Sequence, residues 1–326
     1  APLERRLADL GIDVIEIDLA VPARPYPTLP LRAWKAGREL RRRNVALVHS
    51  FDYGDSYTEA LAARSAGARY VSTKKNMGWG SRGWFLRSLF SDRIAVQNEE
   101  MFRRFFSHRL LRDRTRYVPR GVVVDHFAGV GGSRAEARDR FGIPKDAVVV
   151  GSVASIQDRK NQLLLVRALP DSPEVHLLLA GPVIDEDYRD RVVSEATERG
   201  VADRVHLVGQ LDDVRPALAA SDVFALASRA EGSPVALIEA MSAGLPVLAT
   251  SIPGVSELLA GSEAAVLVDP DDLAGATAAL ASLCGDAERR ARMGAVAQAL
   301  VRARRSIDLE VARTESMYLE LLWTAT

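Results

Sequence analysis

The chain of 326 residues has a single cysteine, Cys284, and few aromatic residues, at 6%. One thiol excludes a disulfide within the chain and favours a reducing, cytoplasmic location. No apolar run approaches the roughly 20 residues that a membrane-spanning helix needs, and no signal peptide precedes Pro2, so we expect a soluble or peripheral protein. Only five of the 43 basic residues are lysines, so a lysine at a predicted site carries more weight than an arginine would.

Motifs of several other enzyme classes are also absent. The sequence has no Walker loop, no GxGxxG after the strand that contains Gly151, and no Gly-x-Ser-x-Gly. Nucleotide binding in the P-loop or NAD mode and an α/β-hydrolase elbow are therefore disfavoured. The five histidines do not fall at metal-ligand spacings, and Asp185–Asp187 lies on an expected peripheral loop. We therefore predict no metal site and no cofactor.

Charge is distributed unevenly along the chain. Residues 1–132 hold 23 Lys+Arg against 14 Asp+Glu, and because the whole chain holds 43 of each, the remainder holds 20 against 29. Arg32–Arg43 and Met101–Arg116 carry much of the positive charge, the second with interleaved phenylalanines. An amphipathic basic helix of this kind can lie on an anionic membrane, as a peripheral contact at the inner face of the cell membrane. The alternative is a solvated arginine-rich face. No recognised motif accompanies the charge, which argues against nucleic acid.

Strand and helix patterns alternate along the whole chain. A length of 326 residues with 48% hydrophobic content supports about two domains. Continuous apolar runs are typical of parallel strands that are buried on both faces. We expect an α/β fold with two doubly wound parallel sheets, joined by a linker at Gly129–Ser133, with ligands bound in a cleft between them. The strand candidates are Asp13–Leu19, Val45–Phe51, Arg69–Thr73, Arg93–Gln97, Arg116–Val118, Ala147–Ser155, Val175–Gly181, Val205–Gln210, Asp222–Ser228, Pro246–Thr250 and Ala264–Asp269.

The segment Glu231–Glu239, EGSPVALIE, follows a strand candidate and opens a helix pattern that stops at Gly244. Ser233 is a suitable N-cap and Pro234 a suitable first helical residue. Free backbone N–H groups and the positive end of the helix dipole should then face a ligand, and a diphosphate would fit there.

Two carboxylates flank this helix start. Glu231 lies in the loop before the helix and Glu239 about a turn and a half inside it, so both could face one ligand. A carboxylate accepts hydrogen bonds and donates none, which suits recognition of hydroxyls on a sugar or ribose. The plain alternative is that Glu231 complements the helix end and Glu239 is solvated.

More than thirty residues around these carboxylates, SRAEGSPVALIEAMSAGLPVLATSIPGVSELL, resemble the signature of retaining glycosyltransferases of the two-Rossmann (GT-B) type, family 4. Val153–Leu165 and Leu178–Val208 also look like that family. The resemblance implies a retaining, metal-independent hexosyltransferase that uses a nucleoside-diphosphate sugar and a sugar, lipid-linked or small-molecule acceptor. It also implies an acceptor-binding domain at 1–130, a nucleotide-sugar-binding domain at 131–307, and a helix at 308–326 that crosses back to the first domain.

The resemblance assigns roles to individual residues. Lys160 falls on the family's lysine, which grips the diphosphate and neutralises charge on the leaving group. The family binds the diphosphate with an arginine as well as this lysine. The arginine's position is occupied here by Ser155, so one of the two cations is missing unless Arg159 contacts the diphosphate. Glu231 would contact donor-sugar hydroxyls and Glu239 the ribose. The backbone at Gly209, Gln210 and Leu211 would lie along the edge of the nucleobase. Backbone N–H groups of the segment Gly232, Ser233, Pro234 and Val235 would bind the sugar and phosphate oxygens, except at Pro234, which has no N–H.

The first half departs from the family's pattern. The segment VHSFD retains His49, a catalytic candidate, but has Phe51 where the family often has a second histidine. A histidine at a strand end is also commonly a structural residue. Asp52 and Asn76 are candidate acceptor contacts. The chain begins with a segment that resembles the family's interior, so we expect the first strand and glycine-rich loop to be missing. A nucleotide-sugar-binding protein without transferase activity and a GT-B-fold nucleotide-sugar epimerase are therefore alternatives.

Overall fold

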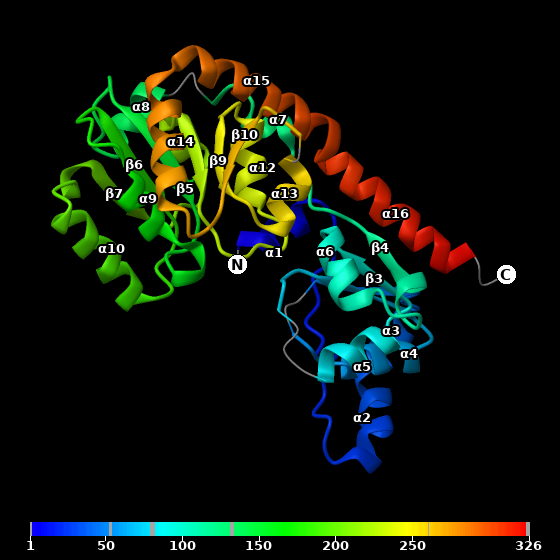
Figure 1. Cartoon of the computed structure of the whole chain (residues 1–326). Coiled ribbons are helices and arrows are strands. Elements are labelled where there is room, and N and C mark those ends of the chain that lie inside the picture. Colours follow the sequence, from blue (N-terminus) through cyan, green and yellow to red (C-terminus); the bar gives the residue numbers. More distant parts are fainter. Residues whose placement is uncertain (1, 52–53, 79–81, 131–133, 260, 324–326) are drawn as a thin grey trace. The chain divides into compact units, whose positions relative to one another are not determined.

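The computed structural model describes residues 2–51, 54–78, 82–130, 134–259 and 261–323 (Figure 1). The chain divides into two compact units, each built from separate stretches. Unit 1 comprises Ala1–Val96, Arg104–Arg116 and Ser316–Thr326, and unit 2 comprises Gln97–Arg103 and Tyr117–Glu315. The expected linker at Gly129–Ser133 lies partly outside the described residues, and the three-part division expected from the sequence stays a prediction.

Unit 1 contains most of a four-stranded sheet in the order β1-β2-β3-β4. Its strands are β1 (Leu47–Ser50), β2 (Arg69–Lys74), β3 (Arg93–Val96) and β4 (Thr115–Tyr117). The first three pair in parallel, with Val48 opposite Tyr70 and Ser72 opposite Ile94. The four strands confirm the four predicted between Val45 and Val118. The helices of this part are α1 (Pro2–Asp9), α2 (Leu29–Ala36), α3 (Arg38–Arg42), α4 (Thr58–Ser65) and α5 (Arg82–Phe90).

The strand predicted at Asp13–Leu19 is wrong, because that segment has no regular structure. Val14 and Ile15 are 45% and 44% exposed, whereas Ile17 and Leu19 pack against a small core around Leu40. A strand forms only where a neighbouring strand satisfies its N–H and C=O groups. Among the described residues none pairs with this segment, so its β-forming residues do not form a strand.

The amphipathic helix expected within Met101–Arg116 is also wrong. The segment forms the end of α6 (Glu99–Met101), a π-helical turn at Phe102–Phe106 and a 3-10 turn at Arg112–Arg114. Phe106 is fully buried, so it does not belong to an outward apolar face. Phenylalanine spacing alone did not show whether these rings face the core or the solvent.

Unit 2 is built on a six-stranded sheet in the order β10-β9-β8-β5-β6-β7, and all the neighbouring strands pair in parallel. The six strands confirm those predicted for the second half. They are β5 (Val148–Val153), β6 (Val175–Ala180), β7 (Val205–Gly209), β8 (Val223–Leu226), β9 (Val247–Thr250) and β10 (Ala265–Val268).

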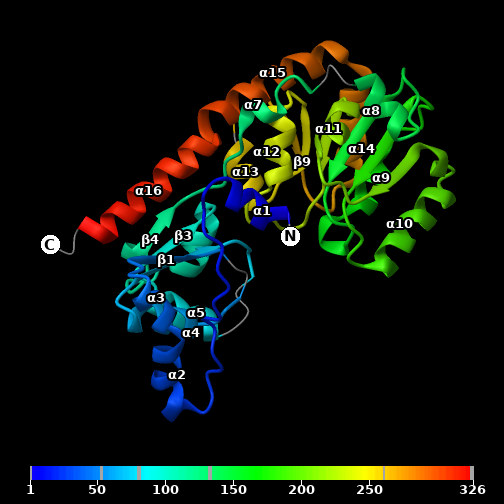
Figure 2. The ribbon, with the colours of Figure 1, turned by 180° about the vertical axis from the view of Figure 1, so that it is seen from behind.

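Helices cover both faces of this sheet (Figure 2). Val150 and Val223 belong to one hydrophobic core, while the alternate residues Phe224 and Val247 belong to another. Both faces are therefore buried, which explains the continuous apolar runs in the sequence. The helices of unit 2 include α7 (Val124–Phe127), α8 (Arg134–Arg140), α9 (Gln162–Ala168), α10 (Glu186–Glu198), α11 (Arg215–Ala220), α12 (Val235–Ser242), α13 (Pro253–Leu259), α14 (Leu273–Gly285) and α15 (Ala287–Arg304). The last helix, α16 (Ile307–Trp323), begins in unit 2 and belongs to unit 1 from Ser316 onward.

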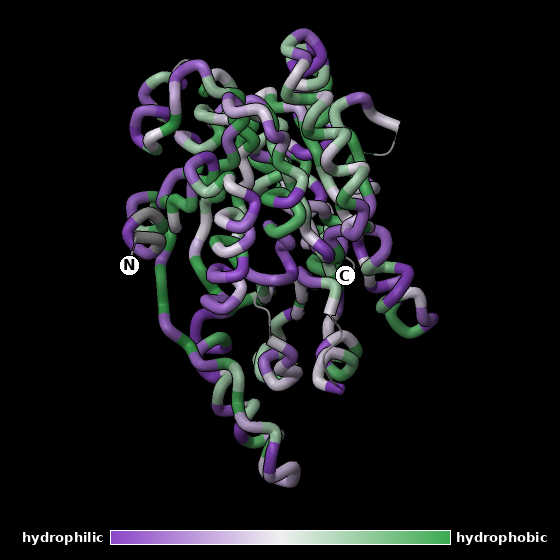
Figure 3. Tube along the Cα trace, turned by 60° about the vertical axis from the view of Figure 1, so that its left-hand side comes forward, coloured by the Kyte–Doolittle hydropathy of each residue, from purple (hydrophilic) through white to green (hydrophobic). Residues whose placement is uncertain are grey.

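Figure 3 shows hydrophobic and hydrophilic residues alternating along many of the helices, as expected for helices that turn one side to a sheet. In α9 the buried residues include Leu163, Leu165 and Val166, which pack in the same core as Leu280 of α14. The helices are therefore positioned by packing against the sheet, and the loops that connect strands to helices are available to form a site.

Candidate functional site

The strand order of unit 2 reverses between β5 and β8, which are neighbours in the sheet. Val150 is opposite Val223 and Gly151 is opposite Phe224. Doubly wound sheets bind ligands at such a reversal, in the crevice beyond the carboxyl ends of the strands. Gly151 is needed at this junction, because a Cβ atom there would lie 2.0 Å from the Ser221 hydroxyl oxygen. The candidate site is therefore formed by the loops that follow β5 and β8.

An ion pair joins these two loops. Lys160, after β5, places its Nζ 2.5 Å from Oε1 of Glu231, after β8. Ser228 donates its hydroxyl to the same Oε1 at 2.7 Å. The side chains of Lys160 and Glu231 are 15% and 10% exposed, so the pair is largely shielded from water. The two residues singled out in the sequence, 71 positions apart, are thus brought together by the sheet topology.

The helix after Glu231 begins one residue later than predicted. Pro234 occupies the N-cap, α12 begins at Val235, and no side chain caps it, so the predicted capping by Ser233 is wrong. Proline has no N–H, and Leu237 and Ile238 both donate to the Pro234 carbonyl at 3.1 and 3.3 Å. Among the described residues, the N–H groups of Val235 and Ala236 have no hydrogen-bond acceptor. The positive end of α12 therefore still offers free donors beside Glu231.

Arg159 and Ser155 lie in the loop after β5. Arg159 donates to the Ala230 carbonyl at 3.0 Å, and its own carbonyl accepts from the Arg229 N–H at 2.9 Å. Arg159 thus links the β5 and β8 loops beside the ion pair. The Ser155 hydroxyl accepts from the Gln157 side chain at 2.6 Å. That Arg159 takes the place of the family's phosphate-binding arginine stays a prediction.

Of the remaining donor-side candidates, Gly209, Gln210 and Leu211 lie at the carboxyl end of β7, whereas Glu239 lies inside a helix. Gly209 ends β7, two strands from β5, and has a φ of +71°, which glycine adopts without strain. Gln210 is exposed, whereas Leu211 is partly buried. Glu239 lies on α12 in a half-buried position, and burial raises the pKa of its carboxyl group. The assignment of these residues to the nucleobase and ribose stays a prediction.

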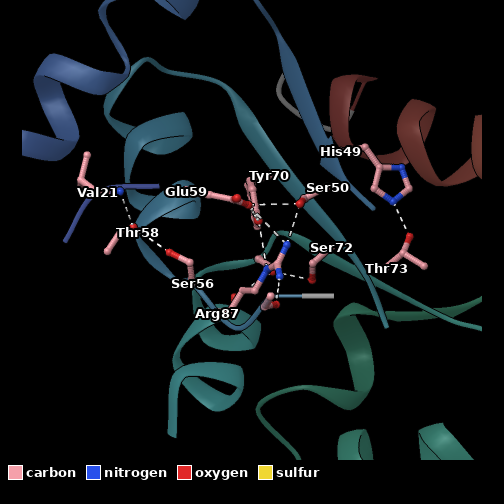
Figure 4. A network of polar contacts seen from close by, with 12 residues as sticks. Val21, His49, Ser50, Ser56, Thr58, Glu59, Tyr70, Ser72, Thr73 and Arg87 are labelled. Carbon is pink, nitrogen blue, oxygen red and sulfur yellow. Dashed lines mark hydrogen bonds and ion pairs between the residues drawn. The ribbon is translucent and has the colours of Figure 1, made fainter. Parts of the chain in front are cut away.

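His49 is the residue before the end of β1, and both of its ring nitrogens have hydrogen-bond partners. Nδ1 lies 2.5 Å from the Tyr318 hydroxyl, and Nε2 lies 2.7 Å from the Thr73 hydroxyl, a contact that Figure 4 shows. Burial lowers the pKa of His49 to about 4, so the ring is neutral at pH 7. A catalytic role would require the ring to give up one of these partners, and it stays a prediction.

Of the two acceptor candidates, Asp52 lies outside the described residues. Asn76 accepts a hydrogen bond from Lys74 at 2.6 Å. Lys74 is fully buried at the end of β2, with its Nζ 4.1 Å from the centre of the Trp84 ring, and burial lowers its pKa to about 8. Asn76 therefore has a local structural contact, and its part in acceptor binding stays a prediction.

A buried arginine in unit 1 was missed by the sequence reasoning. Figure 4 shows Arg87 of α5 among polar groups from three other elements. Its guanidinium donates to the Tyr70 hydroxyl at 3.1 Å and the Ser50 hydroxyl at 2.7 Å, and lies 3.4 Å from Glu59. It also donates to the Gly54 carbonyl. Nothing in the sequence distinguishes this arginine from the other 37, because only the fold shows that its side chain is enclosed.

A second missed residue is Asn98, which is 1% exposed and donates to the Gly232 carbonyl at 2.6 Å. Its sequence context, Asn98-Glu99-Glu100, resembles a helix cap and gives no sign of a contact with residue 232. The hydrogen bond links Asn98 to the loop that carries Glu231.

The two parallel sheets and the loops at the strand reversal define a GT-B-type fold. A glycosyltransferase from Rickettsia africae ESF-5 matches with a TM-score of 0.87 and 17% identity, over 99% of this chain and 88% of that one. Anabaena Alr3699/HepE in complex with UDP and glucose matches with a TM-score of 0.83 and 19% identity, over 97% of this chain and 88% of that one. At these identities the likeness shows the fold.

The family follows from the sequence match. The family model "Glycosyl transferases group 1" matches residues 133–299, more than half of the 326 residues, and the chain belongs to this family. The lipopolysaccharide core biosynthesis glycosyltransferase LpsE of Rhizobium meliloti (strain 1021) is 34% identical over 171 residues, which is 52% of this chain and 49% of that protein. The matched part spans about half the length of the curated relatives.

Proposed function

We propose that this chain transfers a sugar from a nucleoside-diphosphate sugar to an acceptor hydroxyl, with retention of anomeric configuration and without a metal ion. The observation that carries the proposal is the Lys160–Glu231 ion pair, which lies at the strand reversal directly before the free N–H groups of α12. Membership of a glycosyltransferase family supports the donor class. Alr3699/HepE was solved with UDP and glucose, so a UDP sugar is the first donor to test.

The ion pair supplies the groups that the reaction needs. Lys160 can transfer its hydrogen bond from Glu231 to the diphosphate, where it neutralises charge on the leaving group. Glu231 is then free to accept hydrogen bonds from donor-sugar hydroxyls. As the bond from the sugar to the phosphate oxygen breaks, the acceptor oxygen bonds to the same carbon, and its proton passes to the leaving phosphate. No protein nucleophile is required.

Diphosphate recognition is the direct test of this function. Calorimetric titration with UDP, GDP and ADP should find one nucleotide that binds, and removing its terminal phosphate should weaken binding about 10- to 100-fold, because a charge-assisted contact is lost. Lys160→Met should abolish most of this difference. Lys145→Met is the matched control, because Lys145 is exposed in the same unit.

Turnover separates the proposal from its alternatives. Slow release of the nucleoside diphosphate from the matching nucleotide sugar supports a transferase. Tight binding without release, even with acceptors present, would indicate a binding protein, and a changed sugar on an intact nucleotide would indicate an epimerase. Either result would refute the proposed reaction.

We also propose that unit 1 contacts an anionic membrane through the α2 surface, defined as Leu31, Trp34 and Lys35 of α2 together with Arg38 and Arg42 of the adjoining α3. Leu31 and Trp34 are 54% and 51% exposed, and the three cations are exposed at helical spacing from them. Residues 32–43 hold six cations and one acid, Glu39. Apolar side chains surrounded by cations fit the interface of an anionic bilayer. No helix in the described ranges is long and apolar enough to cross a bilayer.

Sedimentation with vesicles tests the α2 surface. Binding to phosphatidylglycerol-containing vesicles at low salt should fall about 30-fold in the variant Lys35→Ala/Arg38→Ala, because each cation near an anionic surface contributes about 1 kcal/mol. The variant Arg292→Ala/Arg302→Ala removes the same charge from α15 and should bind as the parent does. Equal binding to vesicles of phosphatidylcholine alone would contradict the electrostatic part of this proposal.

A further inference from the structure

The Gly232 peptide, in the loop between β8 and α12 that carries Glu231, is hydrogen-bonded to a buried side chain. Asn98 donates from Nδ2 to the Gly232 carbonyl oxygen at 2.6 Å. The segment that carries Asn98 belongs to unit 2 and is anchored on α13, because the Glu99 N–H donates to the Glu257 carboxylate at 2.7 Å. The contact is therefore built from fixed elements and not from a mobile surface side chain.

The space for this contact depends on Gly254 of α13. A Cβ atom at residue 254 would lie 2.9 Å from the Gly232 oxygen and 3.4 Å from Nδ2 of Asn98. The first distance is shorter than real Cβ contacts, so any side chain would displace the Gly232 peptide. The position of the Gly232 carbonyl group thus depends both on the hydrogen bond from Asn98 and on the absence of a side chain at Gly254.

Fixing the carbonyl also fixes the next N–H group. In a planar trans peptide the C=O and the following N–H point in opposite directions. With the Gly232 carbonyl turned toward Asn98, the Ser233 N–H is turned away from it. Among the described residues this N–H has no acceptor, and it lies between Glu231 and the free N–H groups of α12.

We propose that Asn98 is a positioning residue that orients the Ser233 N–H toward an anionic oxygen of the bound donor, on its diphosphate or on its sugar. This inference rests on the proposed function of the same site. Asn98 does not touch the donor and acts only through the Gly232–Ser233 peptide. Preorganised backbone donors of this kind stabilise charge that develops in the transition state.

The two atoms of the Asn98 amide allow this role to be separated from helix capping. Oδ1 accepts from the Met101 N–H at 2.7 Å and caps α6, whereas Nδ2 alone holds Gly232. Asn98→Asp keeps the cap and loses the donor, and Asn98→Ser keeps a neutral cap without the reach to residue 232. Agreement between the two variants excludes the added charge as the cause.

The experiment compares both Asn98 variants and Gly254→Ala with the parent, using the nucleotide sugar that the parent turns over. We expect kcat/KM to fall about 10- to 100-fold in all three, as for loss of one hydrogen bond to a charged group. The control Gly285→Ala, where a Cβ atom meets nothing within 4 Å, should keep the parental value. Affinity for the nucleoside diphosphate locates the contact: unchanged affinity places the N–H on the sugar, and reduced affinity places it on the diphosphate.

A purely structural role predicts a lower melting temperature with parental kcat and KM below it, and this result would overturn the inference. If the Asn98 variants fail to fold, Gly254→Ala decides alone, because it leaves the α6 cap intact. A parent that binds and turns over a nucleotide sugar while all folded variants match it refutes only the role of Asn98. A parent that binds no nucleotide refutes the proposed function itself, and the inference with it.

Discussion

Glu231→Gln should lower kcat about 100- to 1,000-fold while the affinity for the nucleoside diphosphate changes little, the magnitude found for removal of one preorganised group at a reacting centre. Glutamine keeps the size of the side chain but removes the charge that faces the donor sugar. It also releases Lys160, which lies 2.5 Å from Glu231, so the lysine stays available to the diphosphate. A loss in kcat without a loss of binding is the signature of a group that acts in the transition state.

The control for this variant is Glu263→Gln, an exposed glutamate of the same unit that should keep parental kinetics. The combination with Lys160→Met gives a stricter test. Because Glu231 and Lys160 are in direct contact, the loss in the double variant should be smaller than the two single losses combined. Parental kcat in Glu231→Gln would refute the role of Glu231, and strict additivity would show that the ion pair has no part in catalysis.

Arg87→Leu should lower the free energy of unfolding of unit 1 by about 3 kcal/mol, because it leaves the Glu59 carboxylate without its cation, with only the Ser50 and Tyr70 hydroxyls as donors. Arg87 is fully buried, whereas its partner Glu59 has an 18% exposed side chain. Unfolding in urea can be followed by tryptophan fluorescence. The tryptophans among the described residues, at 34, 84 and 323, fall within the ranges of unit 1, so their fluorescence reports on that unit.

Arg82→Leu is the matched control, because Arg82 is exposed at the start of the same helix. It should change stability by no more than about 0.5 kcal/mol. The double variant Arg87→Leu/Glu59→Leu should recover part of the loss, since replacing both partners of a buried pair by apolar residues is often close to neutral. An unfolding midpoint of Arg87→Leu equal to that of Arg82→Leu would contradict a stabilising role for the buried network.

The strands of unit 2 could be predicted because a strand that is buried on both faces consists of consecutive apolar residues. Each of its six strands reads as an apolar run, and each run is found in the sheet. Asp13–Leu19 has similar residues but no strand, because a strand also needs a neighbour to accept its hydrogen bonds. The prediction that Ser233 caps α12 was wrong because serine is only statistically preferred at N-caps. In the structure Pro234 occupies the N-cap.

The sequence by itself determined the alternating α/β pattern, the family, and the importance of Lys160 and Glu231, because local spacing and residue type carry that information. Only the tertiary structure decided that Lys160 meets Glu231, that Asn98 holds Gly232, and that one arginine of many is enclosed with Glu59. These contacts join residues up to 134 positions apart. Their distances depend on strand order and helix packing, which bring together side chains that no local pattern relates.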